Sequence, residues 1–218
     1  MTSSPHEARF DAALARLPLV AILRGLRPGE AVPVAEALYE AGFRLIEVPL
    51  NSPEPFTSIE TLRRRLPEDA LVGAGTVLRA EDVARLAETG AELAVMPHAD
   101  TAVIGAAARA GLLCVPGIAT PTEAFAALAA GAAALKVFPA EMVGPPVIKA
   151  IRAVLPAGTR LLPVGGITPE NMAPFLEAGA AGFGLGSALY KPGLTATEVG
   201  TRARRFVEAW GQAQPEAS

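Results

Sequence analysis

The stretch EAGFRLIEV (residues 40–48) runs from an Ala- and Glu-rich helical segment, through a glycine, into a short apolar run. Four further segments repeat this pattern around Gly90, Gly111, Gly131 and Gly179. A glycine at such a place can adopt the left-handed conformation that ends a helix. The repeated stretch therefore predicts a chain in which helices and short strands alternate.

The spacing of these glycines gives the size of the repeating unit. Counted from Gly42 they are 48, 21, 20 and 48 residues apart, and each long gap holds a proline-marked helix end, at Pro67 or Pro156. The unit is thus about 20 to 25 residues long, enough for one helix and one strand. The apolar runs give eight expected strands, at residues 19–23, 44–48, 71–74, 93–96, 112–115, 134–138, 160–164 and 182–185. The pattern predicts helices near 28–41, 53–66, 80–89, 100–110, 120–130, 145–155, 168–178 and 195–211, and a leading helix near 5–16.

Strict alternation of parallel strands with helices allows two architectures, an open doubly wound sheet or a closed barrel. An open dinucleotide-binding sheet usually has a glycine-rich loop after its first strand, whereas this chain has Arg24-Gly25-Leu26-Arg27-Pro28 there. Eight near-equal units in 218 residues favour the barrel. The expected fold class is therefore α/β, a (β/α)8 TIM barrel forming one domain over residues 1–218, with an extra N-terminal helix covering its bottom.

The composition excludes several classes of protein. The net charge of -3 argues against a nucleic-acid partner, which needs a clustered basic surface. We expect the basic run Arg63-Arg64-Arg65 to form a solvated helix face. No stretch of 18 apolar residues predicts a membrane span, and the N-terminus lacks a signal-peptide core. The single cysteine, Cys114, is expected to be a small core residue, and the protein to be cytoplasmic.

Lys136 is the most informative residue, because it interrupts the apolar run of residues 132–138. The other two lysines, Lys149 and Lys191, occupy positions expected to be solvated. Burial disfavours an ammonium group and lowers its pKa from about 10.4. The neutral amine that results can attack a ketone. The alternative interpretation is a structural lysine paired with a carboxylate.

Glu47 is a second charged residue inside an apolar strand, at the end where barrel enzymes place their catalytic groups. A carboxyl group near a lysine in a dry barrel can accept and return protons. The alternative is a plain ion pair with Lys136 that serves only structure.

The loops after the seventh and eighth expected strands indicate a phosphate site. Such barrels often bind phosphate between these two loops through backbone amides. The residues in question are Gly165, Gly166, Gly186 and Ser187.

Two more residues at the same end are candidates for binding a substrate carboxylate. Arg24 follows the first strand and could anchor the anion, with help from Thr76 after the third; the alternative for Arg24 is an ordinary surface arginine. His98 has no second histidine or carboxylate at ligand spacing, so no metal site is expected.

Seven motifs spread from about Pro18 to about Ala209 resemble one family, the class I aldolases that cleave 2-keto-3-deoxy-6-phosphosugar acids and 4-hydroxy-2-oxoglutarate. The motifs are Leu23-Arg24-Gly25, Glu47-Val48-Pro49-Leu50-Asn51-Ser52-Pro53, Gly73-Ala74-Gly75-Thr76-Val77, Pro116-Gly117, Leu135-Lys136-Val137-Phe138-Pro139, Pro163-Val164-Gly165-Gly166-Ile167 and Gly184-Leu185-Gly186-Ser187-Ala188-Leu189-Tyr190.

The resemblance implies a set of roles. Lys136 would form the Schiff base, and Glu47 would be the general acid/base, acting through a water. Arg24 and Thr76 would bind the pyruvate part. The phosphate would contact Gly166, Gly186 and Ser187. The resemblance also implies a homotrimer that uses neither a cofactor nor a metal ion.

Two positions, Asn51 and Val164, resemble the branch of the family that acts on the phosphogalactonate epimer. The phosphogluconate branch typically has arginine and threonine there. The side chain of Val164 cannot hydrogen-bond a sugar hydroxyl, so it would alter discrimination at C4, where the two substrates are epimers. The expected reaction is reversible cleavage of 2-dehydro-3-deoxy-6-phosphogalactonate to pyruvate and D-glyceraldehyde 3-phosphate.

Several alternatives remain open. The same chemistry could act on the gluconate epimer, on 4-hydroxy-2-oxoglutarate or on both epimers. A phosphosugar isomerase would use the same phosphate loops but form no Schiff base. A non-catalytic anion-binding barrel would leave a buried Lys136 unexplained.

Overall fold

The computed structural model describes residues 5–213, so both ends of the predicted 1–218 domain lie outside the described residues. The strands are β1 (Leu19–Ile22), β2 (Leu45–Pro49), β3 (Leu71–Gly75), β4 (Leu93–Val95), β5 (Leu113–Val115), β6 (Gly117–Ile118), β7 (Leu135–Val137), β8 (Leu161–Pro163) and β9 (Phe183–Leu185). The helices are α1 (Pro5–Arg16), α2 (Pro28–Glu40), α3 (Pro55–Arg65), α4 (Ala80–Glu88), α5 (Thr101–Arg109), α6 (Pro121–Ala129), α7 (Ala140–Val154), α8 (Met172–Glu177), preceded by the 3-10 turn η1 (Pro169–Asn171), and α9 (Ala196–Ala213). The predicted alternation of strands and helices is confirmed.

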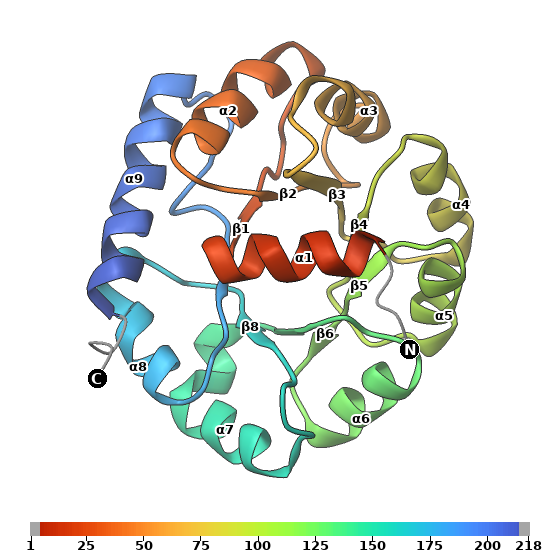
Figure 1. Ribbon diagram of the computed structural model, residues 1–218, viewed down its shortest axis with the longest axis vertical. Helices are drawn as coiled ribbons and strands as arrows, with labels where there is room; N and C mark the ends of the chain where they lie inside the picture. Colours follow the sequence, from red (N-terminus) through yellow and green to blue (C-terminus); the bar gives the residue numbers. More distant parts are fainter. Residues whose placement is uncertain (1–4, 214–218) are drawn as a thin grey trace.

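The strands form a curled parallel sheet with the helices outside it. Hydrogen bonds join the strands in two groups, in the orders β5-β4-β3-β2-β1-β9 and β6-β7-β8. Isolated parallel bridges, Cys114 to Ala132 and Val164 to Gly184, connect one group to the other. Figure 1 shows helices α2 to α9 around the strands and α1 across the middle of the view. This arrangement is of the expected TIM-barrel type.

Two elements differ in detail from the prediction. The fifth expected strand, 112–115, corresponds to β5, and a further short strand, β6, follows after Pro116, which has no backbone N–H to donate to a neighbouring strand. Helix α7 begins at Ala140 rather than at residue 145, but its backbone is kinked at Gly144 (φ 67°, ψ 163°). The turn before Gly144 and the helix that starts at Pro145 are therefore two helical pieces in succession.

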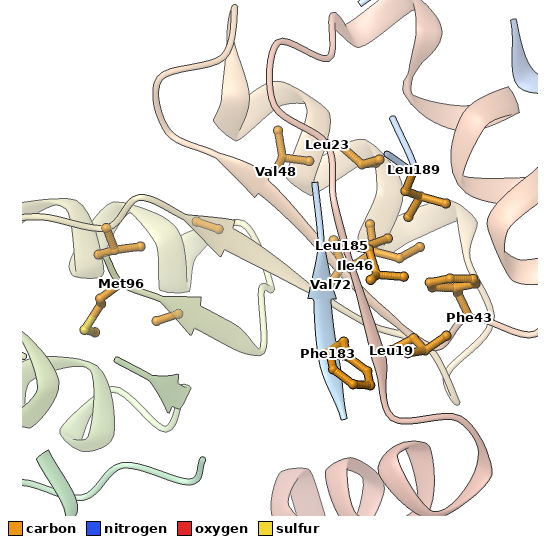
Figure 2. Close-up of a cluster of buried hydrophobic side chains, with 14 of the residues drawn as sticks. Leu19, Leu23, Phe43, Ile46, Val48, Val72, Met96, Phe183, Leu185 and Leu189 are labelled. Carbon is orange, nitrogen blue, oxygen red and sulfur yellow. The ribbon is translucent and has the colours of Figure 1, made fainter. Parts of the chain in front are cut away.

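Buried side chains of β1 to β5 and β8 divide between two hydrophobic clusters. One cluster lies between strands and helices, and Figure 2 shows Ile46, Val72 and Leu185 among its members. The other lies inside the sheet's curl and includes Leu45, Leu71 and Leu162. Successive residues of a strand point to opposite faces of the sheet. The cluster to which a strand residue belongs therefore shows whether its side chain points outward to the helices or inward.

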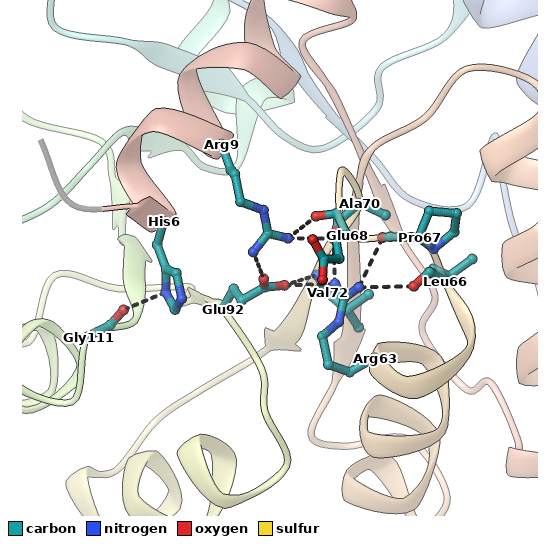
Figure 3. Close-up of polar contacts among 10 residues, drawn as sticks. All are labelled: His6, Arg9, Arg63, Leu66, Pro67, Glu68, Ala70, Val72, Glu92 and Gly111. Atoms are coloured by element: carbon teal, nitrogen blue, oxygen red, sulfur yellow. Dashed lines mark hydrogen bonds and ion pairs between the residues drawn. The ribbon is translucent and has the colours of Figure 1, made fainter.

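Helix α1 covers the end of the sheet at which the strands begin. Its Phe10 and Ala13 belong to the inner cluster. Beside it, the buried Glu92 accepts hydrogen bonds from Arg9 of α1, from Arg63 of α3 at 2.9 Å and from the backbone N–H of Val72 at 3.2 Å (Figure 3). The expectation that Arg63 is solvated is therefore wrong, because its guanidinium turns inward to this carboxylate. In residues 5–213 no helix is long and apolar enough to cross a membrane.

We expect Glu92→Gln to lower the free energy of unfolding by about 3 kcal/mol, because removing one partner leaves two guanidinium groups without their buried carboxylate. Urea denaturation measures the loss. Glu60→Gln is the control: Glu60 forms an exposed pair with Arg64 on α3, and its loss should cost less than about 0.5 kcal/mol. Equal stability of the two variants would contradict the structural importance of Glu92.

Candidate active site

Lys136 points to the inside of the curled sheet from the middle of β7. Its neighbours Leu135 and Val137 belong to the outer hydrophobic cluster, so alternation directs Lys136 to the inside. The side chain is only 5% exposed, and its Nζ lies 4.6 Å from the centroid of the Phe138 ring. Burial lowers the pKa of Lys136, and the cation Arg24 lowers it further, while the carboxyl of Glu47 partly opposes them. The amine is therefore neutral more readily than a solvated lysine.

Glu47 points inward from β2 for the same reason, since Ile46 and Val48 belong to the outer cluster. It is 2% exposed, and burial raises its pKa to about 7 against the opposing effects of Lys136 and Arg24. Within the described part of the chain its Oε2 has no hydrogen-bond partner. A carboxyl group with this pKa can both give and take a proton near neutral pH.

Lys136 and Glu47 influence each other's pKa without direct contact. Among residues 5–213, neither takes part in an ion pair with an N–O distance of 4.0 Å or less. The plain ion pair considered from the sequence is thus not present. Glu92, at the end of the sheet where the strands begin, differs from Glu47 because both of its carboxylate oxygens are hydrogen-bonded.

The glycine motif of β3 makes room for Glu47. A Cβ atom at Gly75 would overlap with Oε2 of Glu47, so a side chain at this position would displace the carboxylate.

Thr76 follows Gly75 and has a left-handed backbone (φ 54°), which is uncommon for a β-branched residue. Thr76 is half-buried and is not among the residues that line the cleft described below. Its contact with a substrate stays a prediction.

Arg24 lies at the end of β1 and is oriented by Asn51. Its Nη1 donates a hydrogen bond to Oδ1 of Asn51 at 2.8 Å. The next residue, Gly25, donates its backbone N–H to Oγ of Ser52 at 2.9 Å. The loops after β1 and β2 are therefore hydrogen-bonded to each other. Asn51, the predicted specificity residue, orients Arg24, the predicted anion-binding residue.

A cleft of about 370 Å³ opens where the strands end. Most of the predicted site residues line it: Arg24, Lys136, Val164, Gly165, Gly166, Gly186 and Ser187. A smaller cavity of about 20 Å³ lies deeper in the barrel and is lined by Glu47, Lys136 and Val164, among others. Lys136 and Val164 thus lie between the open cleft and the buried carboxyl group.

The cleft also contains residues to which the sequence analysis gave no role in the site. Phe138 and Glu141 follow Lys136 along the chain, and Tyr190 and Lys191 follow Ser187. The signal available in the sequence was proximity, since each lies within five residues of a predicted site residue. Lys191 is exposed, as expected, but it lines the cleft rather than an unrelated surface.

Residues 5–213 contain no cluster of three or more His, Cys, Asp or Glu side chains that could hold a metal ion. Cys114 is fully buried, and burial raises the pKa of its thiol to about 12. The prediction that Cys114 is a small core residue is confirmed.

Comparison with known proteins agrees with this geometry. The model of the KDPG and KHG aldolase family matches residues 10–204. The chain is 54% identical, over 88% of its length and 91% of the relative's, to the "Probable 2-dehydro-3-deoxy-6-phosphogalactonate aldolase" of Rhizobium meliloti (strain 1021). It is 48% identical to the "2-dehydro-3-deoxy-6-phosphogalactonate aldolase" of Escherichia coli (strain K12), over 91% of this chain and 97% of the relative.

Among solved structures, the one described as "Native KDPGal structure" superposes with a TM-score of 0.89 at 47% identity, over 91% of this chain and 96% of the other. Family, relatives and fold therefore agree over nearly the whole described chain. The chain belongs to the KDPG and KHG aldolase family and is, as an aldolase, a lyase.

Proposed function

We propose that this aldolase cleaves 2-dehydro-3-deoxy-6-phosphogalactonate reversibly to pyruvate and D-glyceraldehyde 3-phosphate through a Schiff base on Lys136. The observation that carries the proposal is a buried lysine with a lowered pKa that lines the open cleft and shares a small buried cavity with a carboxyl group whose pKa is about 7. The substrate assignment is supported by relatives that bear this name at 54% and 48% identity.

In the proposed mechanism, neutral Nζ of Lys136 attacks C2 of the keto acid, forming a C–N bond. The carbonyl oxygen leaves as water, with protons supplied by Glu47, and a protonated imine results. This cation accepts the electron pair of the C3–C4 bond while Glu47 takes the proton of the C4 hydroxyl. The aldehyde departs, C3 of the enamine is reprotonated, and water releases pyruvate from Lys136. The absence of direct contact between Glu47 and Lys136 fits proton transfer through a water molecule between them.

The rest of the cleft would orient the substrate. Arg24, held by Asn51, would bind the carboxylate, and Thr76 would assist on the pyruvate side. The phosphate would bind the amides and hydroxyl of Gly165, Gly166, Gly186 and Ser187. This chemistry requires neither a metal ion nor an organic cofactor.

Three further proposals concern the whole protein. The bridges at both junctions of the sheet support an eight-stranded closed barrel whose bottom α1 covers. Exposed Phe125, Met142 and Val147 on α6 and α7 offer an apolar face that suits a homotrimer, to be checked by the mass in solution. A single buried cysteine suits the reducing cytoplasm.

Treatment with pyruvate and borohydride should add the mass of a reduced pyruvyl group at Lys136. Lys136→Arg keeps a positive charge but cannot form the imine, so it should lose both the adduct and essentially all cleavage. Peptide mass mapping and a coupled aldehyde assay measure the two effects, with Lys149→Arg on α7 as the control. Trapping at another lysine, or normal turnover by Lys136→Arg, would refute the Schiff-base assignment.

The folded-state pKa of Glu47, about 7, lies above its ordinary value of 4.5, so the folded state binds the extra proton between these values. Stability contributed by the protonated form is present below pH 4.5 and is lost as the pH rises through 7. The cost of ionisation is about 3 kcal/mol. Glu47→Gln cannot ionise at this position, so it escapes the loss that the wild type suffers as the pH rises. We therefore expect the free energy of unfolding of Glu47→Gln, relative to that of the wild type, to increase by about this amount from pH 4 to pH 8. The variant should also lose cleavage activity. A difference that does not change with pH would show that Glu47 is not buried as a titrating acid.

Comparing kcat/KM for the two phosphorylated epimers decides between the galactonate and gluconate substrates. We expect the galactonate epimer to be preferred, and Val164→Thr to shift the ratio about tenfold toward the gluconate epimer, because a hydroxyl then lies beside Lys136 where it can hydrogen-bond the C4 hydroxyl. An isomerase or an anion-binding barrel would release no pyruvate from either compound. A preference for the gluconate epimer in the wild type would overturn the substrate assignment.

A further inference from the structure

Lys191 lies in the loop after β9, four residues beyond Ser187, and lines the cleft at its Gly-rich end. Its neighbours along the chain fix the position of this loop. Tyr190 on one side is buried, and Pro192 on the other packs so closely on Gly25 that a Cβ there would be 2.7 Å from Cγ of Pro192. The backbone of Lys191 is therefore held at the mouth between the loops of β1 and β9, although its side chain is exposed.

The ammonium group of Lys191 has no partner within the described chain. No hydrogen bond or ion pair of residues 5–213 includes its side chain, whereas Arg24 in the same cleft is bonded to Asn51. Lys136 is buried at the cleft floor and is committed to the keto group in the proposed reaction. Lys191 is thus the remaining cation of the cleft lining.

A carboxylate lies beside the expected phosphate position. The side chain of Glu141 lies against the two glycines after β8, since a Cβ at Gly166 would be 2.5 Å from its Cγ. A phosphate dianion bound to the amides of Gly165 and Gly166 would therefore be close to a like charge. Backbone amides carry only partial positive charge, so a full positive charge nearby is needed to offset this repulsion.

We propose that Lys191 is the counter-cation that binds the phosphate of the substrate in the cleft that it lines together with Glu141 and Ser187. The proposal rests on the proposed function, because it assumes a phosphorylated keto acid in the cleft. A lysine on a flexible stem suits a phosphate as a point charge. Lys191 is thereby a phosphate-specific binding residue rather than a catalytic one. Cleavage of the keto acid that lacks the phosphate should therefore not depend on Lys191.

The test compares Lys191→Met, Lys191→Arg and the control Lys149→Met, an exposed lysine of α7 outside the cleft. For the phosphorylated acid, Lys191→Met should raise KM about tenfold, or about 1.4 kcal/mol, with kcat little changed. The arginine variant should restore most of the affinity. With the same keto acid lacking its phosphate, all three variants should match the wild type.

Binding of inorganic phosphate, measured by calorimetry, provides a readout that does not depend on turnover. Lys191→Met should weaken it, and Lys149→Met should not. The proposal is overturned if Lys191→Met keeps the wild-type affinity for inorganic phosphate, or if it loses activity equally on both acids, which would indicate a damaged loop. Failure of the proposed function would appear differently, as a wild type that releases no pyruvate from the phosphorylated acid.

Discussion

The structure depends on one electrostatic constraint: an amine and a carboxyl group share a buried space without touching. Water is a far better solvent for charge than this interior, so burial favours the neutral form of both Lys136 and Glu47. Their mutual attraction opposes that tendency, but it is weakened because no direct ion pair forms. The result is an amine that can act as a nucleophile beside a carboxyl group that exchanges protons near pH 7.

The buried carboxyl groups at the two ends of the strands differ in their hydrogen bonding. At the end covered by α1, Glu92 is hydrogen-bonded by two arginines and a backbone amide, so both of its oxygens have partners. At the open end, Glu47 is left with an oxygen that has no partner in the described residues, and Gly75 leaves the space that this carboxyl occupies. The fully hydrogen-bonded Glu92 thus lies where the strands begin, and Glu47 lies where they end, the end at which barrel enzymes place their catalytic groups.

Local patterns were sufficient to predict most of the fold and the burial of Lys136 and Glu47 inside the curled sheet. Glycines such as Gly42 and Gly179 have the left-handed backbone expected of helix ends, and period-two alternation explains why Lys136 and Glu47 face the same interior. The pattern could not reveal that Arg63 turns inward or that Lys191 reaches the cleft. Both facts depend on loops and helices from distant parts of the chain, Arg63 on Glu92 and the loop of Lys191 on its packing against Gly25. The early start of α7 was missed because the Gly144-Pro145 pair marks a kink and not the beginning of the element.

The most direct test of the buried, neutral amine is a titration of the lysines by NMR, using protein labelled with ¹³C at lysine Cε. The chain has only three lysines, so the signals can be assigned by substituting each in turn. The account predicts that the pKa of Lys136 lies clearly below the ordinary lysine value of about 10.4. A Lys136 signal that titrates at the ordinary lysine value would contradict it.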